Sequence, residues 1–277
     1  MILGTCELCH LTRDLHDSHY LPRGGYKRAR APNLKNPNPI VLSNGKAQQT
    51  SLQVSDYKFC TECEQRLSNG GEAWVLSKVP AEYGQKFEIH TLLDTATPVV
   101  VRNGFLLFPA AKIPGIDLTK LVYFGMSIFW RGTLDWSPVN GGRPPKLFMN
   151  IRQTKAVRQF LLGNGPLPGD MVLTVAVWPF KKVGPMNFVP TQLSGGSYRR
   201  YRFYFSGFIF ILSFGKKLPA EVKRTCAYRA MVLTVSLKIG ESVKQDLLDE
   251  LNAADKTKIQ GTLQEIAAIS STTSSNE

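Results

Sequence analysis

Two Cys-x-x-Cys pairs constrain this chain more than any other feature of its sequence. Cys6 and Cys9 form the first pair, Cys60 and Cys63 form the second, and fifty residues lie between them. Two such pairs supply four thiolates, which is a complete ligand set for one tetrahedral zinc ion. The sequence therefore predicts a structural zinc site that joins two distant segments. Disulfides are the less favoured alternative, because no secretory signal precedes the first pair.

The composition is that of a folded, strongly basic protein. Hydrophobic residues make up 43% of the 277 residues, and the formal net charge is +13. A positive charge of this size favours a polyanionic partner, above all nucleic acid. A basic protein without such a partner is the alternative. Two basic clusters are candidates for binding phosphate groups. The first is Arg23, Lys27, Arg28 and Arg30, and the second is Arg199, Arg200 and Arg202, which lie among tyrosines. For each cluster the alternative is a solvated loop or strand end.

One apolar segment, Phe203–Phe214, resembles a membrane span in composition only. It has twelve residues between basic flanks, whereas a spanning helix needs about twenty. Its aromatic and β-branched residues predict a single strand buried on both faces. We therefore expect a soluble, cytoplasmic protein with no membrane partner.

The sequence divides into three parts. Residues 1–80 carry the cysteine pairs, and within them 23–53 are rich in Pro, Gly, Asn, Lys and Arg, which predicts a long, basic, exposed insertion. Residues 81–240 predict a mixed α+β domain with a mostly antiparallel sheet. A protein partner or a second copy of the chain could bind through residues 81–277. Residues 241–277 predict an amphipathic helical segment, whose apolar positions end near Ile266, and a polar tail.

Helices, strands and turns of the second part follow from periodicity and capping residues. Asp117 is a typical N-cap for a helix over 117–131, and lone Cys226 is expected to be buried. Further predictions are a hairpin over 98–108 around Asn103-Gly104, a helix over 151–162, and strands over 171–178, 203–214 and 230–239.

A histidine-rich segment lies between the cysteine pairs. His19 is followed by Tyr20-Leu21-Pro22, and a neutral imidazole near pH 7 accepts a proton from water readily. Asp17, Glu64 and, with less support, His16 are candidate ligands for a second divalent cation nearby. Spacing alone favours the alternative, in which His16 and His19 are surface residues or support the zinc site. Glu72 is a further acidic candidate or a solvated charge at a helix end.

The sequence of these motifs resembles the zinc-containing HNH nucleases. Cys-x-x-Cys, Asp-Ser-His-x-x-Pro and Phe-Cys-Thr-Glu-Cys-Glu occur in that order within residues 3–75. The resemblance implies a ββα-metal site on a treble-clef zinc scaffold, with His19 as general base, Asp17 and Glu64 as ligands of Mg²⁺ or Mn²⁺, and nucleic acid as substrate. It also implies a bacterial or phage source and a role in antiviral defence.

The chain departs from the HNH pattern at three positions. Ser18 stands where the family has Asp or His before the base, and Glu64 stands where it often has His. The family's middle Asn is absent, and Ser55 and Asp56 occupy that stretch.

Two other functions remain open beside a metal-dependent endonuclease. One is a non-catalytic zinc module that binds nucleic acid or a protein, and the other is a second domain that binds a small ligand. The sequence has no phosphate-binding loop of the Gly-x-x-x-x-Gly-Lys-Ser/Thr type, no Gly-x-Gly-x-x-Gly and no Gly-x-Ser-x-Gly. These absences leave nucleotide hydrolysis, dinucleotide redox chemistry and serine esterase chemistry without support.

Overall fold

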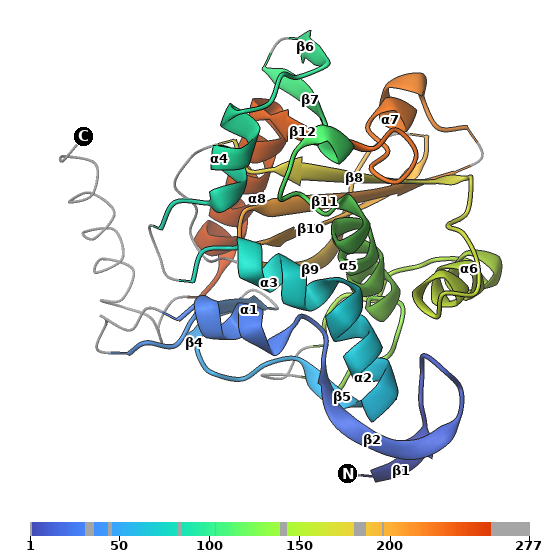
Figure 1. Cartoon of the computed structure of the whole chain (residues 1–277). Coiled ribbons are helices and arrows are strands. Elements are labelled where there is room, and N and C mark those ends of the chain that lie inside the picture. The colour runs from blue at the N-terminus through green and yellow to red at the C-terminus, as the bar shows by residue number, and fades with distance from the viewer. Residues whose placement is uncertain are drawn as a thin grey trace.

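The computed structural model describes residues 2–30, 36–43, 46–81, 85–102, 104–138, 143–179, 187–195, 197–215 and 217–255. Within these residues the fold is mixed α+β, as predicted. A three-stranded sheet near the N-terminus lies at one end of the molecule, and a seven-stranded sheet fills its centre (Figure 1). Helices connect the two sheets and cover the central one.

The N-terminal sheet has the antiparallel order β1-β2-β5 and leads directly into a helix. A β-bulge between His16 and Asp17 shifts the register of the central strand. Strand β5 continues without a loop into α2, so the paired strands β2 and β5 are followed directly by a helix. The elements are β1 (Ile2–Thr5), β2 (Thr12–His19), β5 (Ser55–Cys60) and α2 (Thr61–Leu67).

The segment between β2 and β5 folds back onto the protein, which corrects the prediction of an exposed insertion. Gly25 is buried, and a Cβ at this position would lie 2.6 Å from the ring of Phe205. The Asn187 side chain donates a hydrogen bond to the Gly25 carbonyl at 2.9 Å. Residues 31–35, 44 and 45 of the predicted insertion lie outside the described residues. The elements are α1 (Arg23–Arg28) and the hairpin of β3 (Ile40–Ser43) and β4 (Lys46–Gln49).

A π-helical turn links α2 to the next helix and packs closely against α5 (Leu118–Arg131). Gly71 lies in this turn, and a Cβ there would be 2.4 Å from the Lys120 carbonyl oxygen, so only glycine permits this approach. The connecting elements are η1 (Ser68–Glu72), α3 (Ala73–Lys78) and α4 (Glu88–Asp94).

The central sheet has the order β6-β7-β12-β8-β11-β10-β9, with one parallel pair, β12 and β8. Helix α5 packs on one face, where Phe124 contacts the rings of Phe203 and Phe210. Neighbouring Arg202 points to the opposite face and reaches Asp246 of α8. The strands are β6 (Val100–Arg102), β7 (Phe105–Pro109), β8 (Met171–Val177), β9 (Asn187–Leu193), β10 (Arg199–Phe205), β11 (Phe208–Phe214) and β12 (Val232–Ser236).

Three of the remaining helices, α5, α6 and α8, begin at a residue whose side chain caps the helix, whereas η2 and α7 have no such cap. Asp117 accepts a hydrogen bond from the Lys120 backbone N–H at 3.0 Å, which confirms it as the N-cap of α5. Asn150 and Gln153 form a capping box at the start of α6. The helices are η2 (Ala110–Lys112), α5 (Leu118–Arg131), α6 (Ile151–Leu161), α7 (Ala220–Arg224) and α8 (Leu237–Ala253).

Two predicted strands have other boundaries. The run 203–214 is part of a hairpin, because Ser206 and Gly207 have φ of 42° and 103° and reverse the chain between β10 and β11. The run 230–239 splits into β12 and the first turn of α8. Strand β9 was not predicted. The hairpin of β6 and β7 is confirmed, although Asn103 in its turn lies outside the described residues, as do residues 256–277 of the predicted C-terminal segment.

One hydrophobic core includes side chains from both sides of residue 80. Phe59 of β5 contacts Trp130 of α5, with ring centroids 5.9 Å apart. Cys226 is fully buried beside Val172 and Leu218, as expected. None of the helices in the described ranges has the length and apolarity that crossing a membrane requires.

Candidate metal centre

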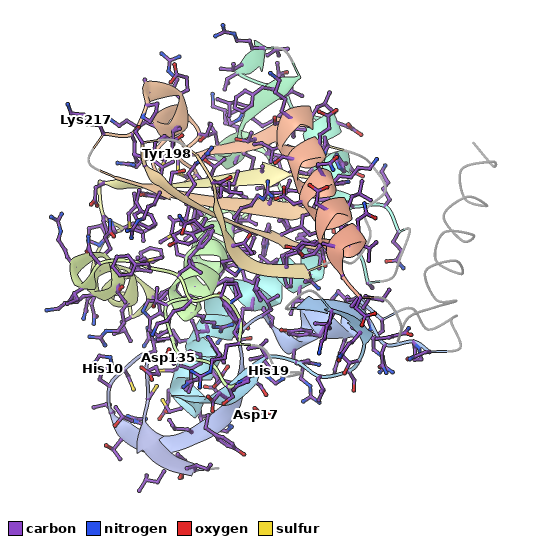
Figure 2. The ribbon with its side chains drawn as sticks, turned by 180° about the vertical axis from the view of Figure 1, so that it is seen from behind. His10, Asp17, His19, Asp135, Tyr198 and Lys217 are labelled. Atoms are coloured by element: carbon purple, nitrogen blue, oxygen red, sulfur yellow. The ribbon has the colours of Figure 1, made fainter. Side chains whose placement is uncertain are left out.

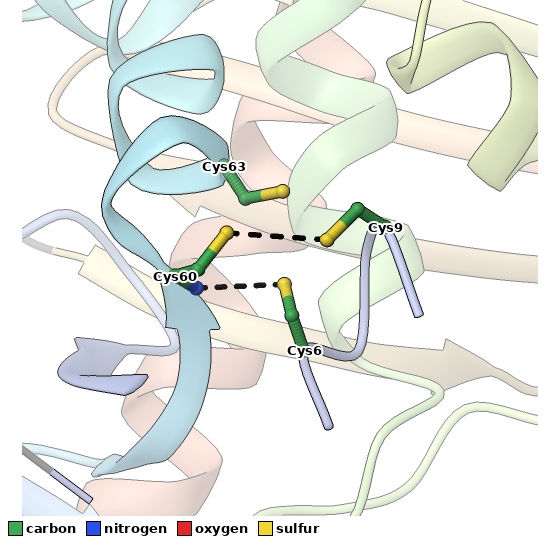
Figure 3. A group of neighbouring side chains, drawn as sticks. All are labelled: Cys6, Cys9, Cys60 and Cys63. Carbon is green, nitrogen blue, oxygen red and sulfur yellow. Dashed lines mark hydrogen bonds between the residues drawn. The ribbon is translucent and has the colours of Figure 1, made fainter. Parts of the chain in front are cut away.

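The four paired cysteines converge at one point of the N-terminal sheet (Figure 3). Cys6 and Cys9 come from the tight turn between β1 and β2, and Cys60 and Cys63 come from the end of β5 and the first turn of α2. All four sulfur atoms lie within 4.8 Å of one another, and none is in a disulfide. The structure therefore confirms the predicted meeting of the two pairs.

The spacing of the sulfurs fits a zinc ion. Four sulfurs about 2.3 Å from a central zinc in a tetrahedron are about 3.8 Å from one another. The Cys9 and Cys60 sulfurs are 3.9 Å apart. Three of the four side chains are buried, and Cys9 is half-buried, so the site is closed in the way that structural zinc sites are.

The protein also supplies donors to the thiolates. The Cys60 backbone N–H points at the Cys6 sulfur at 3.4 Å. A hydrogen bond with the Cys63 thiol lowers the pKa of Cys6 to about 4, although burial acts in the opposite direction. The same hydrogen bond raises the pKa of Cys63. A proton shared within the cluster is what a metal ion displaces when it binds.

The Ser18 hydroxyl is occupied by hydrogen bonds to the backbone. Ser18 is 1% exposed, and its hydroxyl donates to the His16 carbonyl at 3.2 Å and accepts from the Phe59 N–H at 3.0 Å. His16 lies beside the start of α2, where its Nε2 is 2.7 Å from the Thr61 hydroxyl. Both side chains thus support the packing of β2 against β5 and α2.

Asp17 and His19 flank Ser18 in β2, and because successive side chains of a strand alternate, both lie on the face opposite to Ser18. Asp17 is exposed and His19 is half-buried. Burial lowers the pKa of His19, while the negative charge of Asp17 acts against this shift. The neutral imidazole, which is the form that accepts a proton, is therefore favoured at neutral pH.

Glu64 is the first residue after the last cysteine and lies in α2. Its Oε1 atom is buried and has no hydrogen-bond partner within the described structure. A buried carboxylate oxygen without a donor is costly, and a bound cation is one way of compensating for it. In the part of the chain that the structure describes, however, the cysteines are the only group of three or more His, Cys, Asp or Glu side chains placed to hold a metal ion together. Asp17, His19 and Glu64 therefore do not converge as a trio.

Glu72 has a role that the sequence did not predict. It is neither a free ligand nor a solvated charge, because its Oε1 accepts a hydrogen bond from Arg131 of α5 at 2.5 Å. Arg131 is 2% exposed and also donates to the carbonyl oxygens of His19 and Tyr20, at 3.3 and 3.2 Å. Its guanidinium carbon lies 5.6 Å from the centroid of the Phe59 ring. A buried ion pair thus ties the end of β2 to the central sheet's main helix.

The first basic cluster surrounds a small cavity beside α1. Arg23, Lys27 and Arg30 line this cavity of about 140 Å³, together with Tyr26. Arg28 differs from them, since it is half-buried and its Nε is enclosed without a hydrogen-bond partner among the described residues. Three of the four predicted groups are thus gathered on one surface near the end of β2.

The second basic cluster is divided by the sheet. Arg199 is exposed, and the Arg200 guanidinium donates to the Ser194 and Gly195 carbonyls. Arg202 is 7% exposed, forms an ion pair with Asp246 of α8 and donates to the Ser242 hydroxyl at 3.0 Å. Arg202 is therefore not available to a phosphate, contrary to the prediction.

Comparison of the chain with known proteins gives no match. No family model matches the chain, and neither a curated protein nor a solved structure matches it significantly.

The sequence signal for Arg131 was its position at the end of an apolar helix, which is also the usual place for a capping charge. Its pairing with Glu72 depends on the approach of η1 to α5, which no local pattern encodes.

Proposed function

We propose that this chain is a metal-dependent, HNH-like endonuclease that hydrolyses nucleic-acid phosphodiester bonds. The observation that carries the proposal is the order of elements around the cysteines. His19 ends strand β2, β2 pairs with β5, and β5 runs straight into α2, which carries Cys63 and Glu64. A treble-clef zinc scaffold with a ββα-metal site has this order. The convergent cysteines would bind the zinc ion that stabilises such a scaffold.

The His19 imidazole is the candidate general base. Burial keeps it neutral, and the contacts of Arg131 with the backbone carbonyls of His19 and Tyr20 fix the strand end. In the proposed reaction His19 takes a proton from the water that attacks phosphorus, and the P–O bond to the departing strand breaks. Arg23, Lys27 and Arg30 attract the phosphate backbone.

Asp17 and Glu64 are the candidate ligands of Mg²⁺ or Mn²⁺. The unpartnered Glu64 oxygen fits a cation ligand, whereas the Ser18 hydroxyl does not, because both of its hydrogen bonds go to the backbone. Magnesium sites commonly use one or two carboxylates and complete their shell with water and substrate oxygens. When bound, such a cation supplies charge stabilisation to the phosphoryl oxygens.

A second function is favoured by one observation: among the described residues, Asp17, His19 and Glu64 do not form a group that could hold a metal ion together. This is a zinc-stabilised module that binds nucleic acid without cleaving it. The basic cavity beside α1 serves this function equally well. The same experiment separates the two.

The test incubates the zinc-loaded full chain with plasmid, single-stranded DNA and RNA, each with Mg²⁺ or Mn²⁺. We expect cleavage, and we expect His19→Ala to slow it by on the order of 100-fold or more, the usual contribution of a general base. His10→Asn is the matched control, because His10 is exposed at the zinc turn and has a φ of 62° that asparagine tolerates.

Zinc content is measured in every variant. If the parent cleaves nothing under any of these conditions, or if His19→Ala cleaves as fast as the parent, the catalytic assignment is wrong. Salt-dependent binding without cleavage would instead establish the non-catalytic function.

A further inference from the structure

A large open cavity lies at the end of the central sheet, away from the cysteines. Its volume is about 620 Å³. It forms where β9 ends, β10 begins and β11 ends, and the first turn of α6 closes one side. Figure 2 labels Tyr198 at this end of the sheet, far from Asp17 and His19. The lining includes Phe148, Asn150, Gln153, Asp170, Tyr198 and Arg199.

One wall of the cavity is a stacked pair that protrudes into solvent. The Arg199 guanidinium carbon lies 4.5 Å from the centroid of the Phe148 ring, and Arg199 donates to the Phe148 carbonyl at 3.4 Å. Phe148 is 61% exposed, yet its backbone N–H is held by the Tyr201 hydroxyl at 3.1 Å. An arginine placed over one ring offers the other face of its guanidinium plane to a second planar group.

Another part of the lining is polar and hydrogen-bonded. Gln153 is 5% exposed, accepts from the Asn150 N–H at 3.2 Å and donates to the Asp170 carboxylate at 3.5 Å. These hydrogen bonds place amide and carboxylate groups at the start of α6, where the helix dipole is positive. The cavity therefore combines a planar surface with fixed hydrogen-bonding groups.

The charge around the cavity is positive. Arg200 lies over the ring of Tyr198, at 5.6 Å from its centroid. Arg229 donates to the Gly169 carbonyl, next to Asp170. Of these three arginines only Arg199 lines the cavity, and Asp170 is the one carboxylate in its lining. With Arg200 and Arg229 close to lining residues, the surroundings favour an anionic ligand over a cationic one.

We propose that this cavity binds one unpaired nucleotide, with its base stacked against the Arg199–Phe148 pair and its phosphate attracted by the surrounding arginines. The volume lies within the range of about 300–1,000 Å³ that small-molecule sites occupy. Bases inside a double helix are already stacked, so a concave site with a stacking wall takes an unpaired nucleotide. The proposal does not depend on cleavage at His19.

The nucleotide has two possible sources, a free mononucleotide or a single strand of nucleic acid, and calorimetric titration distinguishes them. The zinc-loaded full chain is titrated, without added Mg²⁺ or Mn²⁺, with AMP, GMP, CMP and UMP, and with a single-stranded DNA of about ten nucleotides. Ribose 5-phosphate is the matched ligand without a base. We expect binding of a mononucleotide or of the strand, and much weaker binding of ribose 5-phosphate.

Two variants test the stacking wall, and neither side chain is part of the core. We expect Phe148→Ala and Arg199→Ala each to weaken nucleotide binding on the order of tenfold. Arg102→Ala is the control, because Arg102 is an exposed arginine on β6, at the other edge of the sheet from β9.

Each outcome decides the proposal. Binding of a mononucleotide, or of the strand alone, with loss in both variants and not in the control supports it and identifies the source. Equal binding of ribose 5-phosphate, unchanged affinity in Phe148→Ala and Arg199→Ala, or no binding of either nucleotide source overturns it. Cleavage by the parent is measured separately, so failure here leaves the proposed nuclease function untouched.

Discussion

Replacing Glu72 by Gln isolates the charge of the buried ion pair beneath His19. The two side chains have the same shape, so the change removes a negative charge and little else. Arg131, at 2% exposure, would keep only neutral partners: the amide oxygen of the substituted side chain, two carbonyl acceptors at 3.3 and 3.2 Å and the ring of Phe59. Breaking a buried pair by removing one partner costs about 3–5 kcal/mol. Because the two carbonyls remain, we expect the lower end, about 3 kcal/mol.

The measurement is the free energy of unfolding in urea, with zinc present throughout. A loss of about 3 kcal/mol corresponds to a fall in melting temperature of roughly 6–12 °C for a chain of this size. Asp135→Asn is the matched control, because Asp135 pairs with Lys146 at 2.8 Å while 74% of its side chain is exposed. Exposed pairs contribute little, so we expect no measurable change.

The double variant Arg131→Met with Glu72→Gln tests the cause of the loss. Removing both charges leaves no unpaired ion. The double variant should therefore lose much less unfolding free energy than the sum of the losses in Arg131→Met and Glu72→Gln. If Glu72→Gln is as stable as Asp135→Asn, or if the losses simply add, then the pair does not hold the end of β2 as argued.

Two further predictions concern the zinc scaffold and its contact with α5. We expect Cys60→Ser to lose the bound zinc and to unfold the N-terminal sheet, whereas the control Cys226→Ala keeps the metal. Elemental analysis measures the zinc content, and circular dichroism measures the loss of structure. Zinc retained in Cys60→Ser would contradict the four-thiolate site. We expect Gly71→Ala to lose on the order of 2 kcal/mol in urea unfolding, because its Cβ would lie 2.4 Å from the Lys120 carbonyl oxygen. Gly165→Ala, with nothing within 4 Å, should match the parent, and equal losses would refute the close approach.

Local signals in the sequence identified the parts of the fold that depend on few residues. Asp117 predicted the start of α5, since an N-cap acts through the backbone N–H three residues later. The two cysteine pairs predicted their own meeting, because their chemistry requires a shared ion. Neither inference needs knowledge of the rest of the chain.

The errors came from features that depend on distant segments. The run around Ser206 and Gly207 is apolar on both sides of the turn, because both strands of the hairpin are covered by helices, so hydrophobicity did not mark the reversal. Arg202 was expected to be exposed, but α8 covers its face and offers Asp246 as a partner. The bulge between His16 and Asp17 likewise depends on the pairing of β2 with β5, where Lys58 has no partner in the register, and no local pattern marks it.

The tie between Arg131 and the end of β2 has a consequence for synthesis of the protein on the ribosome. The four thiols are complete once Cys63 has been made, yet the carbonyl oxygens of His19 and Tyr20 gain their donor only when the chain has reached residue 131. We therefore expect the nascent chain to bind its zinc ion early, and the His19 end of β2 to reach its final position late. A ribosome-bound fragment that ends before α5 would carry metal but would lack the donor that holds the end of β2.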